Sequence, residues 1–140
     1  VWAAEQCKLP DLAYACAVNG TARPVDDSQG IPKAIFEGTL QGLNELSLKK
    51  FRRRMCGTSD LLADFMLRKP DREVDDLRNE LAFIGENAGL QNPFPKVWTE
   101  AWIAEQDAIF PAQHMKHYWT QRCVRIHVAE GPHYPFYEHR

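Results

Sequence analysis

The stretch PDREVDDLRNELAFI, residues 70–84, carries the clearest secondary-structure signal in the chain. Proline is tolerated in the first turn of a helix, and the carboxylates that follow it favour the positive end of the helix dipole. Apolar side chains then recur at spacings of three and four, on one face of a helix: Val74, Leu77, Leu81 and Ile84. The stretch therefore predicts an amphipathic helix that buries this face.

Helical spacing continues on both sides of this stretch. Apolar residues recur every three to five positions from Pro32 to Met55, and Thr58 is a suitable N-cap for the next helix. Residues 97–109 again follow a helical period, and Pro111 is expected to open a last helix that runs to about residue 122. Four or five helices joined by short turns predict a mainly α fold, a small helical bundle.

The two ends of the chain lack this periodicity. Residues 1–31 are predicted to form an irregular, disulfide-linked N-terminal arm, because prolines, glycines and cysteines leave room for only a short helix. Apolar and polar side chains alternate over residues 123–128, as in a strand, but no partner strand is evident. We therefore predict one domain over residues 1–140, with a helical core over residues 32–122 and an extended C-terminal tail over residues 123–140.

The composition is that of an ordinary globular domain. The chain has 140 residues, 44% of them apolar, and a formal net charge of −2. No run approaches the roughly 18 apolar residues that a membrane span needs, and the near-neutral charge argues against a general nucleic-acid-binding domain. We predict no membrane span, no nucleic-acid partner and no cofactor.

Four cysteines without a Cys-x-x-Cys pair indicate two disulfides. We favour the pairs Cys7–Cys16 and Cys56–Cys123, while the crossed pairings stay open. Asn19 begins an Asn-Gly-Thr glycosylation sequon, and the first residues resemble a processed end. These features predict a secreted, extracellular glycoprotein; the alternative is four unpaired thiols in an intracellular protein.

Two surfaces are candidates for binding a partner. Residues 49–54 hold five cations in six positions, a pattern that attracts an acidic protein or an anionic glycan; the alternative is a solvated helix face. The tail holds aromatic residues between prolines, which are suited to contact with a partner. The predicted partner-binding residues are Lys49, Lys50, Arg52, Arg53, Arg54, Tyr134, Phe136 and Tyr137.

His114 and His117 lie three residues apart on the last predicted helix, so their imidazoles project from nearly one face and are suited to share a metal ion. Two ligands do not complete a site. Candidates for a third ligand are Glu105, Asp107, His127 and His133. The alternative is two surface histidines on an amphipathic helix.

No motif dictates a reaction, because the chain has no Gly-x-Ser-x-Gly elbow and no glycine-rich phosphate loop. We therefore lean against an enzyme and predict a secreted helical protein that binds a partner, as an effector, a reproductive or signalling factor, or an inhibitor. One alternative is a small extracellular hydrolase or metal-dependent enzyme that uses His114 and His117. A further alternative is a carrier of a small apolar ligand, lined by Trp98 and Trp102.

Overall fold

The computed structural model describes residues 1–8, 10–90, 92, 98–122 and 124–136. Its elements in chain order are α1 (Trp2–Gln6), β1 (Cys16–Val18), α2 (Lys33–Gln41), α3 (Glu45–Cys56), α4 (Ser59–Arg68), α5 (Val74–Asn87), β2 (Glu100–Ala104), α6 (Ala112–Thr120) and β3 (Arg125–Ala129). The strands form one parallel sheet in the order β1-β2-β3. The fold is therefore α/β, and the prediction of a mainly α helical bundle is wrong.

β2 is the central strand of this sheet and falls where a helix was predicted. Glu100 pairs with Cys16 of β1 on one side and with Arg125 of β3 on the other. A central parallel strand carries apolar residues toward both faces, so a short one is not distinguished from a helix by periodicity alone. β1, an edge strand, was missed because three residues are too few to show an alternating pattern. β3, predicted to lack a partner, pairs along its whole length with β2.

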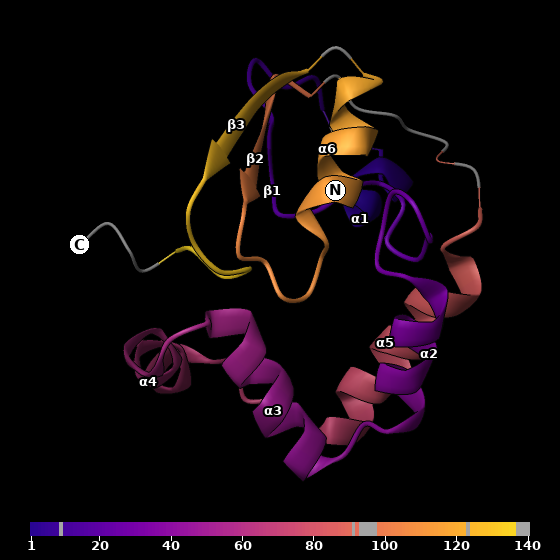
Figure 1. The fold of residues 1–140 in the computed structure, drawn as a ribbon. Coiled ribbons are helices and arrows are strands. Elements are labelled where there is room, and N and C mark those ends of the chain that lie inside the picture. The colour runs from indigo at the N-terminus through magenta and orange to yellow at the C-terminus, as the bar shows by residue number, and fades with distance from the viewer. Residues whose placement is uncertain (9, 91, 93–97, 123, 137–140) are drawn as a thin grey trace.

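One face of the sheet packs against α6 and forms the core. Met115, Tyr118 and Trp119 of α6 are almost fully buried. They belong to one apolar cluster with Ala17, Ala101 and Ile103 of the strands. Small residues on the strands allow the helix to approach closely, and Figure 1 shows α6 lying along one side of the sheet.

The four described helices between β1 and β2, α2 to α5, lie beyond the carboxyl ends of the strands (Figure 1). The helix predicted over residues 70–84 is present as α5, although it begins at Val74 and not at Pro70. Thr58 caps α4 by accepting a hydrogen bond from the Leu61 N–H. The long helical pattern after Pro32 divides into α2 and α3, because Asn44 starts a new helix with a reciprocal capping box to Ser47. None of the described helices is both long enough and apolar enough to cross a bilayer.

The predicted disulfides are also wrong. Cys7, Cys16 and Cys56 are unpaired, and Cys123 lies outside the described residues. Cys16 lies within β1, whereas Cys56 is fully buried at the end of α3. The cysteines are therefore placed by strand pairing and helix packing, without crosslinks to stabilise an irregular arm.

We expect Met115→Ala to lower the free energy of unfolding by about 2–5 kcal/mol, because it leaves a cavity between α6 and the sheet. Urea denaturation measures this loss. Met66, which is 42% exposed on α4, is the matched control, and Met66→Ala should cost no more than about 0.5 kcal/mol. Equal losses for the two variants would contradict the packing described here.

Candidate active site

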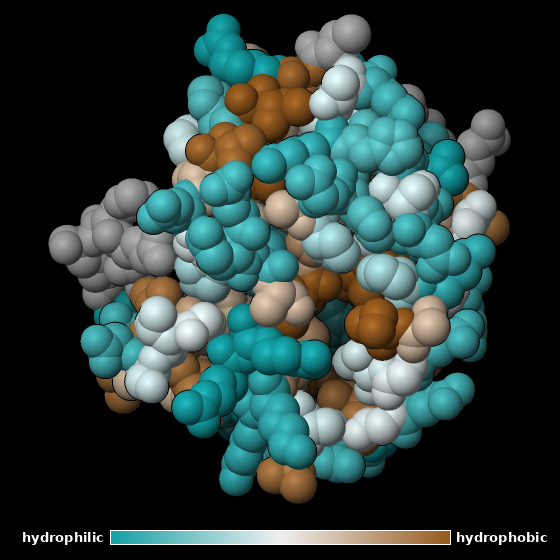
Figure 2. Space-filling view, viewed as in Figure 1, coloured by the Kyte–Doolittle hydropathy of each residue, from teal (hydrophilic) through white to brown (hydrophobic). Residues whose placement is uncertain are grey.

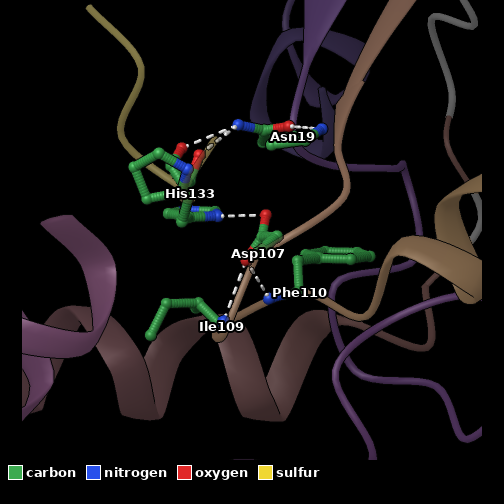
Figure 3. Close-up of polar contacts among 7 residues, drawn as sticks. Asn19, Asp107, Ile109, Phe110 and His133 are labelled. Atoms are coloured by element: carbon green, nitrogen blue, oxygen red, sulfur yellow. Dashed lines mark hydrogen bonds and ion pairs between the residues drawn. The ribbon is translucent and has the colours of Figure 1, made fainter. Parts of the chain in front are cut away.

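Two polar side chains meet beyond the carboxyl edge of the sheet. Asp107 follows the end of β2 and His133 follows the end of β3. Neighbouring parallel strands present their carboxyl ends at one edge, so loops that leave these ends lie side by side. The Nδ1 atom of His133 lies 2.7 Å from Oδ2 of Asp107, as Figure 3 shows. We call these two residues the Asp107–His133 pair.

Both carboxylate oxygens of Asp107 are hydrogen-bonded. Its Oδ1 accepts hydrogen bonds from the backbone N–H groups of Ile109 at 2.8 Å and Phe110 at 2.7 Å (Figure 3). The side chain has no exposed surface, so these donors replace the water that a carboxylate otherwise needs. The carboxylate is thereby oriented with Oδ2 toward His133.

His133 has the arrangement of a general base. A carboxylate only accepts hydrogen bonds, so the proton between the two groups belongs to Nδ1 and the lone pair of the neutral ring lies on Nε2. The His133 side chain is 26% exposed, which leaves the ring accessible. A histidine oriented in this way takes a proton from a hydroxyl, and the carboxylate stabilises the imidazolium that forms.

The backbone around His133 is attached to the end of α3. The Tyr134 N–H donates a hydrogen bond of 3.1 Å to the carbonyl of Met55. Gly57 follows α3 with φ of +75°, and a Cβ there would lie 2.9 Å from Cβ of Pro132. Only glycine suits both this backbone conformation and this close approach. The end of α3 therefore contacts both neighbours of His133.

Asn19 is buried and is not a glycosylation site. Its Nδ2 donates to the carbonyl of His133 at 2.8 Å and to that of Pro132 at 3.4 Å (Figure 3). Its Oδ1 accepts from the Ala104 N–H at 2.8 Å, and the residue is only 5% exposed. An amide with both ends engaged inside the protein cannot carry a glycan, which corrects the sequon prediction.

An apolar cavity adjoins the Asp107–His133 pair. It is partly open to solvent, has a volume of about 80 Å³ and is lined by Ile31, Ile35, Phe36, Thr39, Phe51, Leu81, Ala108 and Ile109. Ile109 connects the two features, since its N–H holds Asp107 while the residue lines the cavity. Figure 2 shows a hollow bordered by hydrophobic side chains over the region of α2, α3 and α5, the helices that line the cavity.

The predicted basic surface lies on α3. Lys49, Lys50, Arg53 and Arg54 are exposed and Arg52 is half-buried. Among the residues that the structure describes, none of these five cations takes part in an ion pair. The end of α3 contacts the loop that carries His133, so these basic residues lie on a helix that touches this loop.

The predicted aromatic surface begins directly after His133. Tyr134 packs edge-on against Phe65 of α4, with ring centroids 5.3 Å apart, and against Phe136 at 5.0 Å. Phe136 is 63% exposed, and Tyr137 lies outside the described residues. The binding of a partner by these aromatic residues stays a prediction.

His114 and His117 lie on α6, and both contact the loop before α2. Nδ1 of His114 lies 2.7 Å from the Gly30 carbonyl and Nδ1 of His117 lies 3.2 Å from the Ser28 carbonyl. The described residues contain no cluster of three or more side chains suited to hold a metal ion. Metal binding by this histidine pair stays a prediction.

A second histidine–carboxylate pair occupies the face of the sheet opposite α6. Glu100 contacts His127 at 2.9 Å, Trp102 at 3.2 Å and the Tyr14 hydroxyl. These hydrogen bonds, that of Tyr14 first, lower the pKa of Glu100 to about 2 and raise the pKa of Tyr14. Trp102 stacks on His127 here, whereas Trp98 packs on Trp119 on the core side, so the two tryptophans do not line one pocket as the carrier hypothesis required.

Sequence reasoning named Asp107 and His133 only as possible third metal ligands. It missed their role because residues 97–109 were interpreted as a helix, which hid the strand end before Asp107. The signal that could have located the pair was an acidic residue and a histidine shortly after two short strands.

The lowered pKa of Glu100 predicts that the free energy of unfolding depends on pH in the acid range. Its pKa is lowered in the folded state from 4.5, so its stabilising contribution is present above pH 4.5 and is lost as the pH falls toward 2. In urea denaturation across this range, the difference in unfolding free energy between the unmodified protein and Glu100→Gln should shrink. Glu37→Gln, at an exposed position on α2, is the control for the loss of one negative charge. Parallel curves for Glu100→Gln would contradict the assignment.

Comparisons with known proteins identify the relatives of this chain. A family model described as "Pimeloyl-ACP methyl esterase BioG" matches residues 1–140. A malonyl-[acyl-carrier protein] O-methyltransferase of Bacteroides fragilis is 46% identical over 138 residues, which are 96% of this chain and 28% of that protein. An uncharacterized protein of Haemophilus influenzae is 38% identical over 138 residues, 97% of this chain and 63% of that protein. The crystal structure of BioG from Haemophilus influenzae matches with a TM-score of 0.79 and 37% identity, over 94% of this chain and 62% of that one.

These matches correct the predicted function. The chain spans less than two thirds of each of these relatives. A family described as an esterase contradicts the secreted binding protein, the extracellular location and the carrier of a small apolar ligand. It is an enzyme family, despite our leaning against an enzyme. The unpaired cysteines and the buried Asn19 remove the grounds on which secretion was inferred. The match over residues 1–140 shows that the chain belongs to the BioG family.

Proposed function

We propose that this chain supplies the acid–base half of an ester hydrolase that acts on an acyl chain attached to a carrier protein. The observation that carries the proposal is the 2.7 Å hydrogen bond from His133 to the buried carboxylate of Asp107. In α/β-hydrolases the triad follows the chain order serine, acid, histidine. Asp107 precedes His133 and both follow adjacent parallel strands, in agreement with the last two positions of that order.

The nucleophile belongs to another part of the complete protein. Ser28, Ser47 and Ser59 are the serines of this sequence, and in the described structure none of their hydroxyls forms a hydrogen bond with His133. The relatives are longer than this chain, which supports a serine contributed from outside these 140 residues.

The proposed reaction has two halves. Nε2 of His133 takes the proton of the serine hydroxyl while the oxygen attacks the ester carbonyl, and the imidazolium then gives that proton to the departing alkoxide, which leaves as an alcohol. Water, deprotonated by the same Nε2, attacks the acyl-serine and releases the acid and the free serine. Asp107 stays a carboxylate throughout and stabilises the imidazolium in both halves.

Two further features support the substrate class. The apolar cavity beside Ile109 suits an aliphatic chain, because the one hydroxyl in its lining, that of Thr39, already donates to the Ile35 carbonyl at 2.9 Å. The cations of α3 suit an acidic carrier protein. The family description, which includes an acyl carrier protein and a methyl ester, agrees with both features.

Hydrolysis is favoured over methyl transfer for this chain. The methyltransferase relative is matched over 28% of its length, so its name describes a protein that is mostly outside the matched region. The Asp107–His133 pair is suited to activate a hydroxyl, which hydrolysis of a methyl ester requires.

His133→Ala in the complete protein that carries this chain should lower kcat for a methyl ester of an aliphatic acid by at least about 10³-fold, and Asp107→Asn by about 10⁴-fold. The asparagine amide would donate to Nδ1, which moves the ring proton to Nε2 and removes the base. Labelling by a phosphonate probe for activated serines should fall in parallel.

His127→Ala is the matched control, since His127 also pairs with a carboxylate but lies on the open face of the sheet. It should keep kcat and labelling. Ester hydrolysis that survives His133→Ala would refute the proposal, as would methyl transfer without hydrolysis.

A further inference from the structure

We infer that Asn19 is a positioning residue that holds the His133 loop against the end of β2, an inference that rests on the proposed function. Asn19 follows the end of β1, so it comes from the strand that contributes neither member of the Asp107–His133 pair. Its amide reaches across the carboxyl edge of the sheet to the loops that carry both members (Figure 3).

The hydrogen bonds of Asn19 connect the loop that carries His133 to the end of β2. Nδ2 donates to the backbone carbonyls of Pro132 and His133 themselves, and Oδ1 accepts from Ala104, the last residue of β2 before the Asp107 loop. Its own N–H also donates to the Trp102 carbonyl at 3.0 Å. One side chain therefore sets the distance between the two loops whose side chains must stay 2.7 Å apart.

The conformation of Asn19 indicates that this position is specialised. Its φ is +48°, in the left-handed region that asparagine and glycine tolerate better than other residues. It is also 5% exposed, although an asparagine is costly to bury unless its amide is fully hydrogen-bonded. A strained backbone and a buried amide at one residue are typical of a position where the structure requires a particular geometry.

Substitutions can separate these contributions. Asn19→Gly keeps the left-handed backbone and removes only the side chain. Asn19→Asp keeps an acceptor for the Ala104 N–H but replaces the donor by a carboxylate oxygen facing the two carbonyl groups, at the cost of adding a negative charge. Thr21→Val is the matched control: Thr21 is 3% exposed in the same segment, and its hydroxyl donates to the Gln29 carbonyl at 2.7 Å, away from His133.

In the complete protein, Asn19→Gly and Asn19→Asp should each lower kcat for the aliphatic methyl ester about 10- to 100-fold, with KM changed less than about twofold. Phosphonate labelling should slow equally. The NMR resonance of the His133 Nδ1 proton should weaken, because its hydrogen bond to Asp107 is made less often. Thr21→Val should lower the melting temperature but keep kcat and the resonance.

Each remaining outcome decides the inference. If Asn19→Gly and Asn19→Asp keep kcat while His133→Ala abolishes it, Asn19 does not position the base and the proposed function stands. If the unmodified protein shows no His133-dependent hydrolysis, the proposed function fails, and the Nδ1 resonance of the Asn19 variants still tests the hydrogen-bond network. If Asn19→Gly fails to fold, the kcat and the Nδ1 resonance of Asn19→Asp, which has nearly the same shape as the natural residue, test the inference.

Discussion

The parallel pairing of β2 with β3 is the constraint on which the rest of the structure depends. Their register runs from Glu100 opposite Arg125 to Ala104 opposite Ala129, so the two strands end level with each other. The following loops therefore start at one edge, and Asp107 and His133 come within 2.7 Å. A register shift of one residue would turn Ala101 and Ile103 away from α6 and would separate the two loops.

The Asp107–His133 pair is positioned largely by backbone groups. Asp107 is oriented by the N–H groups of Ile109 and Phe110, and the residues on either side of His133 are held through the Met55 carbonyl and through contact with Gly57. Backbone groups keep their hydrogen-bonding ability whatever side chain is attached, apart from the nitrogen of proline. The geometry of the pair therefore depends on where α3 and the loop after β2 lie, more than on the identity of most residues around it.

The sequence predicted the helices better than the sheet, for a physical reason. α4 has a side-chain cap at Thr58, α5 has carboxylates in its first turn and α6 follows Pro111, and all of these are local signals. The strands have three to five residues, and β2 is stabilised by partners that are distant in sequence, 84 residues away at Cys16 and 25 residues away at Arg125. No local pattern contains that information, so the loop after β2 was placed inside a helix and the partner of His133 was not recognised.

Asn19 illustrates why a local motif alone misleads. An Asn-Gly-Thr triplet indicates an exposed turn because asparagine tolerates positive φ and glycine follows easily. The structure uses the same tolerance for a turn at the carboxyl edge of the sheet, where φ is +48° but the residue is buried. Burial then converts the amide from a possible attachment point into a connection among three strand ends. The sequon predicted an exposed side chain, whereas the environment, which depends on long-range strand pairing, determines what the side chain does.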